Sequence, residues 1–397
     1  MPPDSSTDAR SRRRVLSSLA AAGALSVTGC TTTLPPLGQR VRFGRIDFPQ
    51  SDLPMYRKWI PARSALPERH AKAIHAARPG TLPPGTLGRG LFVGPSDYFG
   101  TDFEEYERAV DVGGAYVFEG PTSQNTVADA LDGTGYEPAG NYESYALYDR
   151  DDAPRAVAVT DGTVLWAQGE NRHRSIEVAA DVGAGRLDRR HETDDEFAAM
   201  TDAMGTNDFD IIDGLDLGLE STTDALLTGT SHTYRQDAAY FRSQHLFESA
   251  ESVPEASIKR ELRASETAVR ADAVDVRTEG RRVIIETRTD GSDVDVDWRT
   301  PQVTWGADYD PDAGTVTLGH EAGHPVDAEA LVVSKRESGA PDSGFSEADG
   351  RQFADSYDTV QPGDTLVITV GESTVSVFVT FRPSEHRSSR LFTYNLP

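Results

Sequence analysis

The sequence predicts an α+β protein, with two ferredoxin-like βαββ halves followed by a C-terminal immunoglobulin-like β-sandwich. Two observations predict this fold class. The middle of the chain contains the order strand, helix, strand and hairpin twice, and about the last hundred residues contain short apolar runs separated by turn residues. Together with an export signal at the start, these changes predict four segments: a signal peptide at 1–29, a lipidated tether and irregular segment at 30–90, the α+β body at 91–290 and the β-sandwich at 291–397.

The N-terminus carries a predicted export and lipidation signal. Arg12 and Arg13 precede an apolar run at residues 15–27, which is too short to span a bilayer and leads into Val27-Thr28-Gly29-Cys30. Twin arginines are typical of export after folding, and a small-residue box that ends in cysteine is typical of lipidation. We therefore expect cleavage before Cys30 and attachment to the extracytoplasmic face of the cell membrane through a lipid on that residue. The alternatives are an uncleaved N-terminal anchor and a chance match to the lipidation box.

The charge of the chain limits its partners and its setting. The chain contains 39 Lys and Arg against 64 Asp and Glu, which gives a formal net charge of −25, and only four of the basic residues are lysine. This composition resembles proteins of extremely halophilic archaea, in which salt screens the repulsion between carboxylates. No basic stripe is present, so nucleic acid is not expected as a partner. Because Cys30 is the only cysteine, no internal disulfide is expected.

The segment that follows the tether is rich in proline. Residues 40–48 alternate weakly and predict an edge strand, and a short helix is expected over residues 68–77. Residues 55–60 place aromatic side chains beside Arg57 and Lys58. Such clusters more commonly form a small core beneath a loop, and contact with lipid headgroups near the anchor is the alternative interpretation.

The α+β body contains a degenerate internal repeat of strand, helix, strand and hairpin. The first copy is predicted as a strand from 115, a helix at 125–131, a strand at 142–148, and a hairpin of 156–159 and 163–167 that turns on Asp161-Gly162. The second is predicted as a strand from 244, a helix at 255–262, a strand at 273–277, and a turn on Glu279-Gly280 into 282–287. Helices are expected between the copies at 175–180 and 194–204, and a strand or loop at 208–217. The alternative is that two α+β segments share this order by chance.

The C-terminal segment is predicted to be all β. Short apolar runs separated by turn residues predict strands at 294–298, 303–305, 315–318, 330–333, 365–369, 374–381 and 391–394. Residues 314–328, with the sequence GTVTLGHEAGHPVDA, resemble the β-sandwich of haloarchaeal type IV pilins, a resemblance that implies a strand, a tight glycine turn and a second strand. Two positions depart from that family, because His324 stands where it usually has Asp and Ala322 replaces a glycine. The assembly helix of the pilins is replaced by the lipidation box, so filament assembly is not implied.

The upstream part resembles exported haloarchaeal lipoproteins without assigned activity. The residues that carry this resemblance are Tyr56, Trp59, Ile60 and Pro61, in the pattern Tyr-x-x-Trp-Ile-Pro.

One motif indicates a specific reaction. His320-Glu321-Ala322-Gly323-His324 matches the pattern of zinc peptidases, in which a helix places both histidines on one face and the glutamate acts as general base. The context argues against that helix. Val316 and Leu318 alternate at the period of a strand, and Pro325 directly after the motif would cost about 3 kcal/mol inside a helix.

Two further patterns are weaker. Residues 293–297, with the sequence DVDVD, begin like a calcium loop, but the glycine and the glutamate that such a loop requires are absent, and a strand with a solvated face is the favoured interpretation. Tyr136, Tyr142, Tyr145 and Tyr148 occur at strand spacing and are expected to pack on or beside a sheet, with a groove as the alternative.

These observations predict a non-catalytic, lipid-anchored surface module that binds or scaffolds an unidentified surface protein or ligand in a halophilic archaeon, without a cofactor. The alternative is a zinc-dependent metallopeptidase that uses His320, Glu321 and His324. A solute-binding protein would require a deep cleft between the two halves, which nothing in the sequence demands. The surface module and the peptidase differ over residues 316–326, which form a strand and a turn in the module and a helix in the peptidase.

Overall fold

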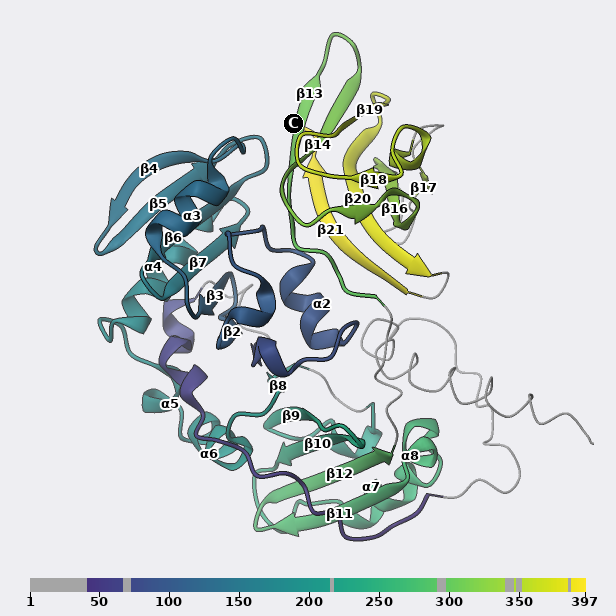
Figure 1. Cartoon of the computed structure of the whole chain (residues 1–397). Helices are drawn as coiled ribbons and strands as arrows, with labels where there is room; N and C mark the ends of the chain where they lie inside the picture. The colour runs from purple at the N-terminus through teal and green to yellow at the C-terminus, as the bar shows by residue number, and fades with distance from the viewer. Residues whose placement is uncertain are drawn as a thin grey trace, which may run out of the picture. The chain divides into compact units, whose positions relative to one another are not determined.

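A computed structural model describes residues 41–66, 73–214, 218–290, 298–339, 346–347, 352–384 and 387–397. The predictions for Arg12, Arg13 and Cys30, and for residues 293–297, lie outside these described residues. The described part is mostly antiparallel sheet with few helices, which agrees with the predicted α+β class (Figure 1). No described helix is both long and apolar enough to cross a membrane.

The chain divides into two compact units. Unit 1 contains Met1–Leu87 and Asp181–Val296, and unit 2 contains Gly88–Ala180 and Asp297–Pro397. Two of these divisions lie close to the predicted boundaries after residues 90 and 290, and a third falls inside the predicted α+β body. The first half of that body therefore belongs to the same unit as the C-terminal segment, and the second half belongs with the N-terminal segment.

Unit 1 is built on a set of antiparallel strands in the order β11-β12-β10-β9-β8-β1. The strands are β1 (Ile74–Ala77), β8 (Phe209–Ile212), β9 (Leu227–Tyr234), β10 (Ala238–Leu246), β11 (Ala273–Glu279) and β12 (Arg282–Asp290). The helices are α5 (Arg190–Thr193), α6 (Asp195–Met204), α7 (Glu255–Leu262) and α8 (Glu266–Arg270), with the short 3-10 helices η1 (Met55–Trp59), η2 (Arg63–Ala65), η4 (Pro79–Thr81) and η6 (Glu220–Thr222).

Helices α6 and α7 pack on strands of the sheet of unit 1. Helix α6 begins where the side chain of Asp194 accepts a hydrogen bond from the backbone N–H of Phe197, and it packs on β9 and β10. Helix α7 packs on β11 through Ile258 and Leu262, which lie four residues apart and therefore share one face. Both side chains enter a core that includes Val274, Val283 and Ile285.

The α+β region of unit 2, residues 88–180, contains strands in the order β2-β3-β7-β6-β5-β4. These strands are β2 (Arg108–Asp111), β3 (Ala115–Glu119), β4 (Glu137–Tyr142), β5 (Tyr145–Arg150), β6 (Arg155–Thr160) and β7 (Thr163–Gln168). The helices are α2 (Leu87–Val93), α3 (Gln124–Leu131) and α4 (Arg172–Gly183), with η5 at Phe103–Glu105; α2 and α4 begin or end just across the boundary between the units.

The two α+β halves share an order of strand pairing. In the first half, strand β3 leads through α3 to the β6–β7 hairpin, and β3 pairs with β7. In the second half, strand β10 leads through α7 to the β11–β12 hairpin, and β10 pairs with β12. The first half differs by an additional hairpin, β4–β5, between its helix and its last hairpin, where the second half has α8.

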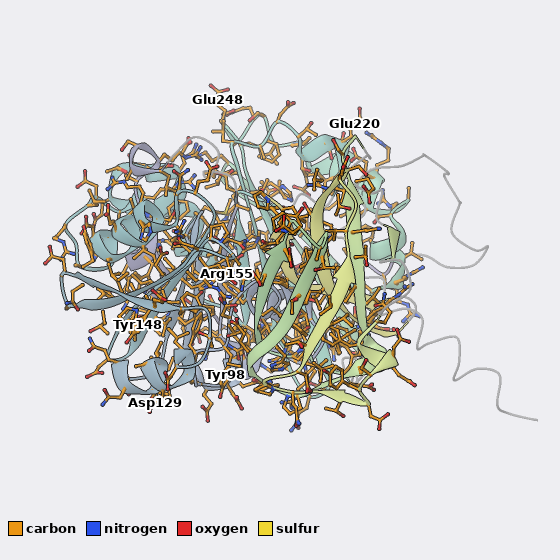
Figure 2. All side chains as sticks on the ribbon, turned by 90° about the horizontal axis from the view of Figure 1, so that it is seen from above. Tyr98, Asp129, Tyr148, Arg155, Glu220 and Glu248 are labelled. Atoms are coloured by element: carbon orange, nitrogen blue, oxygen red, sulfur yellow. The ribbon has the colours of Figure 1, made fainter. Side chains whose placement is uncertain are left out.

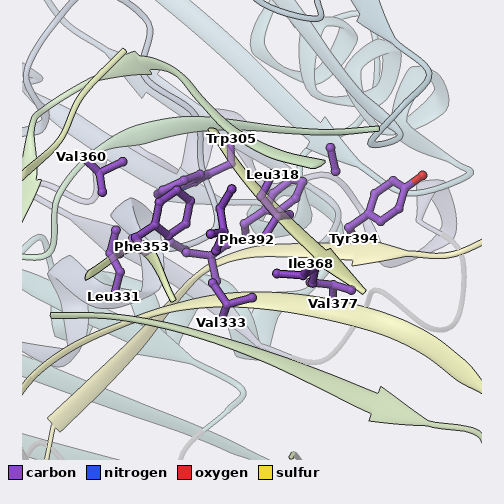
Figure 3. Close-up of a cluster of buried hydrophobic side chains, with 14 of the residues drawn as sticks. Trp305, Leu318, Leu331, Val333, Phe353, Val360, Ile368, Val377, Phe392 and Tyr394 are labelled. Atoms are coloured by element: carbon purple, nitrogen blue, oxygen red, sulfur yellow. The ribbon is translucent and has the colours of Figure 1, made fainter. Parts of the chain in front are cut away.

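The C-terminal region, residues 298–397, contains two larger sheets and one core. One sheet has the order β13-β14-β19 and the other β17-β16-β20-β21, and β15 pairs with β18. Figure 3 shows side chains from both sheets meeting around Trp305 and Phe353, which are fully buried. The strands are β13 (Val303–Asp310), β14 (Thr315–Gly323), β15 (Val326–Asp327), β16 (Leu331–Glu337), β17 (Ser346–Glu347), β18 (Thr359–Val360), β19 (Thr365–Thr369), β20 (Thr374–Ser384) and β21 (Arg387–Asn395), with η7 (Ala328–Ala330) and η8 (Phe353–Asp355).

Several local predictions are confirmed. The predicted helix at 255–262 is α7, and the predicted strand at 365–369 is β19. Both predicted hairpin turns form, and Gly162 and Gly280 adopt positive φ angles of 83° and 60°, which glycine accepts at low cost. The strand, turn and second strand expected at 314–328 form as β14 and β15.

Three local predictions are wrong. Ile74–Ala77 forms strand β1 instead of the end of a helix, because its backbone pairs with β8. Residues 142–148 form parts of two strands, because Glu143 turns the chain with a φ of 54°. The edge strand expected at 40–48 is reduced to a single bridge between Phe43 and Val274.

Candidate functional site

The His-Glu-x-x-His motif lies on a strand. Residues 315–323 form β14, so the strand prediction is confirmed and the helix that the peptidase alternative requires is not formed. Successive side chains of a strand point to opposite faces. His320 therefore points with Val316 and Leu318 into the core of the C-terminal region, and Glu321 points away from that core.

His320 is held as part of the core. Its side chain is almost fully buried and its ring lies 5.4 Å from that of Trp305. Its Nε2 atom is 2.9 Å from the carbonyl oxygen of His324. Burial lowers the pKa of His320, and the contact with the His324 carbonyl opposes this shift. A buried imidazole in this position acts as a packing group with one polar contact.

His324 follows the end of β14, and its side chain contacts the α+β region of unit 2 and not the core that holds His320. Its Nε2 atom is 2.8 Å from Oδ1 of Asp102, and its ring lies 5.7 Å from that of Tyr98. The side chain is about one-third exposed. Tyr98 and Asp102 belong to the α+β region of unit 2, so this contact links that region to the C-terminal region.

Glu321 makes a second link between the same two regions. Its Oε2 atom accepts hydrogen bonds from Arg150 Nη1 at 3.0 Å and from the backbone N–H of Gly135 at 3.2 Å. Arg150 also binds Asp152 through Nε at 2.8 Å and Nη2 at 2.5 Å, and its side chain is fully buried. Burial raises the pKa of Glu321, and the Arg150 charge and the Gly135 N–H oppose that shift. Burial also raises the pKa of Asp152, but hydrogen bonds from Arg150 outweigh it and hold that pKa below its usual value.

A second buried cluster lies around Asp97, which is fully buried. Asp97 pairs with Arg155 and accepts hydrogen bonds from Tyr136 Oη at 2.6 Å and Trp166 Nε1 at 3.1 Å. The Arg155 guanidinium also lies 4.9 Å from the ring centre of Phe392, a residue of β21. Figure 2 places Arg155 beside the strands of the C-terminal region. Burial and the Asp97 carboxylate raise the pKa of Tyr136 well above its ordinary value, so its hydroxyl remains a donor.

We call these two clusters the polar junction of unit 2; its members are Asp97, Tyr136, Arg150, Asp152, Arg155, Trp166 and Glu321. Two glycines leave room for the Glu321 and Arg150 side chains of this junction. A Cβ atom at Gly306 would lie 2.0 Å from Glu321 Oε1, and one at Gly135 would lie 2.6 Å from Arg150 Nη2. Each carboxylate of the junction already accepts hydrogen bonds from arginine, tryptophan, tyrosine or backbone groups. The arrangement is therefore suited to joining the two regions of unit 2.

The structure separates the three residues of the predicted zinc site. His320 lies in a core, Glu321 binds Arg150, and His324 faces Asp102. Across the described ranges, no group of three or more His, Cys, Asp or Glu side chains is arranged to hold a metal ion. Sequence reasoning identified Glu321 but missed its partners, because Arg150 is 171 residues away and no local pattern connects the two.

The tyrosines considered as groove residues have separate positions. Tyr136 belongs to the polar junction, and Tyr142 faces Tyr145 across the β4–β5 hairpin. Tyr148 lies opposite Pro138 in the same hairpin. They pack on or beside a sheet, as the strand spacing predicts.

Comparison with known proteins gives little further information. No protein-family model and no curated protein matches the chain. Among solved structures, crystal form I of TP0453 aligns with a TM-score of 0.38 and 10% identity, covering 56% of this chain and 91% of that chain. Crystal form III of TP0453 aligns with a TM-score of 0.36 and 11% identity, covering 56% and 92%. Similarity at this level supports no statement about function.

Proposed function

We propose that this chain is a non-catalytic, lipid-anchored module at the extracytoplasmic face of a halophilic archaeal membrane, where it binds or scaffolds a surface protein or ligand. The observation that carries the non-catalytic part is the engagement of Glu321 by Arg150 and Gly135, with His320 and His324 directed elsewhere. A general base in a zinc peptidase must reach a metal-bound water, which Glu321 in this setting does not. Export and anchoring are supported by Arg12, Arg13 and Cys30.

We also infer that each α+β half is a ferredoxin-like βαββ unit. The support is the shared pairing, in which the first strand lies beside the second strand of the final hairpin, so that β3 and β10 occupy equivalent places. For the C-terminal region we propose an immunoglobulin-like β-sandwich, related to that of haloarchaeal type IV pilins. The two antiparallel sheets around one core support that proposal.

The anchoring proposal is tested by expressing the full chain in a halophilic archaeal host. Substitution of Arg12 and Arg13 by lysine is expected to retain the precursor in the cytoplasm, and Cys30→Ser is expected to release the exported chain from the membrane fraction. Mass spectrometry of the N-terminal peptide is expected to show lipid on Cys30. Export of an unlipidated wild-type chain would contradict the proposal.

The peptidase alternative is tested with the same purified protein in molar salt. Metal content and casein hydrolysis are measured for the wild type and for His324→Ala, which leaves the buried His320 in place. The expected result is no bound zinc and no hydrolysis by either protein. About one zinc per chain, lost together with hydrolysis in the variant, would establish the peptidase instead.

A further inference from the structure

Two large apolar side chains near the start of the described chain are strongly exposed. Leu53 is 76% exposed and Met55 is 53% exposed, more than any other large apolar side chain of the described residues. They flank Pro54 at the entry to η1, in unit 1. The neighbouring Tyr56 and Trp59 are buried, whereas Leu53 and Met55 remain exposed.

The backbone holds these two side chains in place. Asp52 and Thr206 exchange two backbone hydrogen bonds, of 3.1 and 2.8 Å, and the Thr206 hydroxyl donates to the carbonyl of Leu53 at 2.7 Å. Gly205 packs so closely that a Cβ atom there would lie 2.5 Å from the carbonyl oxygen of Asp52. Leu53 and Met55 are therefore displayed on a well-fixed segment and not on a free loop.

We infer that Leu53 and Met55 enter the surface of the lipid bilayer and hold unit 1 against it; this inference rests on the proposed lipidation of Cys30. Two side chains bury far less than the roughly 1,000 Å² that a specific protein interface needs. Insertion into a bilayer needs no complementary surface, because each apolar side chain gains by leaving water on its own. Because the lipid on Cys30 already supplies the affinity for the membrane, the contact of Leu53 and Met55 with the bilayer needs only to fix the orientation of unit 1.

The length of the chain allows both contacts at once. Ten residues separate Cys30 from Val41, and at full extension this connection spans up to about 38 Å. From Val41 the chain crosses the sheet of unit 1: Phe43 bridges to β11, Phe48 packs on Tyr240 of β10, and Asp52 pairs with Thr206 before β8. Strands lie ~4.8 Å apart, so the distance from β11 to β8 is about 19 Å. The anchor can thus reach the same bilayer surface as Leu53.

The test uses single cysteine substitutions in the full lipidated protein. Since Cys30 is the only native cysteine and lipid would block its thiol, an introduced cysteine is the single site for an environment-sensitive NBD label. Leu53→Cys and Met55→Cys are compared with Leu226→Cys and Val367→Cys, whose native side chains are 46% and 42% exposed. The proteins are reconstituted in molar salt into vesicles of phosphatidylcholine and phosphatidylglycerol, with and without doxyl-labelled lipid.

The expected result is a blue shift of the emission and quenching by doxyl lipid at positions 53 and 55, with neither change at 226 and 367. Labels at 53 and 55 that behave like the two controls would overturn the inference. A blue shift at 53 and 55 already present in the unlipidated Cys30→Ser protein, measured in molar salt without detergent or vesicles, would also overturn it, because that shift would indicate contact with a second copy. Mass spectrometry of the same samples separates the two levels: lipid on Cys30 with unshifted labels overturns only this inference, whereas absence of lipid overturns the proposed anchoring itself.

Discussion

Asp97 in unit 2 and Asp210 in unit 1 are both fully buried, yet they are stabilised in different ways. Asp97 pairs with Arg155, whereas Asp210 accepts hydrogen bonds from the backbone and side chain of Asn207, both at 2.8 Å, and from Ser231. With only neutral donors, burial dominates and raises the pKa of Asp210 to about 6. The comparison shows that a fully buried carboxylate can be held either by an arginine or by neutral hydrogen-bond donors alone.

The difference follows from where each residue lies. Asp97 sits where the α+β region meets the C-terminal region, and its ion pair is part of the polar junction that links them. Asp210 lies within one sheet, where Asn207 and Ser231 are close in sequence or on the neighbouring strand. An arginine can bridge two separate regions because its side chain is long and its guanidinium binds two partners at once.

Breaking the ion pair of Asp97 is expected to give the largest effect. Arg155→Met leaves a fully buried carboxylate without its cation, so we expect the free energy of unfolding of unit 2 to fall by about 3–5 kcal/mol. Denaturant unfolding followed by tryptophan fluorescence measures this loss. The double variant Arg155→Met with Asp97→Asn removes both charges and should recover part of the stability. A loss below about 1 kcal/mol in the single variant would show that the Asp97–Arg155 pair does not contribute appreciably to the free energy of unfolding.

The pH dependence of Asp210 gives the next largest effect. Its pKa is about 6 in the fold and near 3.8 otherwise, so the folded state holds the proton more tightly. The stabilising contribution is therefore complete below about pH 4 and is lost as the pH rises through about 6, a change of about 3 kcal/mol. Asp210→Asn does not titrate and should lack this loss. Urea midpoints measured between pH 4 and 7 at constant salt check the expectation.

His232 supplies the control for that measurement. Burial lowers its pKa to about 4, so its contribution is complete above about pH 6.5 and is lost as the pH falls toward 4. Asp210 and His232 therefore act in opposite directions in the wild type. Asp210→Asn should reveal the acid destabilisation from His232, and His232→Gln should reveal the opposite trend. Identical pH profiles of stability for the two variants would contradict the opposite contributions of Asp210 and His232.

Glu321→Gln is expected to have a smaller effect than Arg155→Met. The Glu321 side chain is 21% exposed, and Arg150 keeps Asp152 as a partner. We expect the free energy of unfolding to fall by about 1–2 kcal/mol, because one charged hydrogen-bond acceptor is replaced by a neutral one. Denaturant unfolding measures the change. A loss as large as that of Arg155→Met would mean that the cluster around Glu321 and the cluster around Asp97 contribute equally to stability.

A surface pair should give the smallest effect. Arg174 and Glu177 lie 3.3 Å apart on α4, with side chains 58% and 40% exposed. Water screens such a pair, so Arg174→Ala is expected to change the free energy of unfolding by about 0.5 kcal/mol or less. Its unfolding curve at low and high salt provides the baseline for the buried variants. A larger loss would indicate that Arg174 has a role beyond this pair.

Local structure was predictable from the sequence where a short pattern carries its own physical signal. The predicted helix of α7 matches because Ile258 and Leu262 repeat at helical spacing, and the turn at Gly280 matches because glycine accepts positive φ. The prediction failed at Ile74–Ala77, where pairing with β8 outweighs the local helical preference. It also failed at Glu143, a non-glycine residue whose positive φ is not indicated by any pattern in the sequence.

The sequence by itself determined the α+β class, the hairpin turns at Gly162 and Gly280, and the strand, not helix, character of the motif around His320. In the C-terminal region it determined β13, β14, β16, β19, β20 and β21. Each of these depends on residues close together in the chain, so periodicity and turn residues are sufficient. Only the tertiary structure decided that Glu321 binds Arg150, that Arg155 binds Asp97, and that Leu53 and Met55 stay outside the core. Ion pairs and exposure depend on which distant segments meet, and a linear pattern does not contain that information.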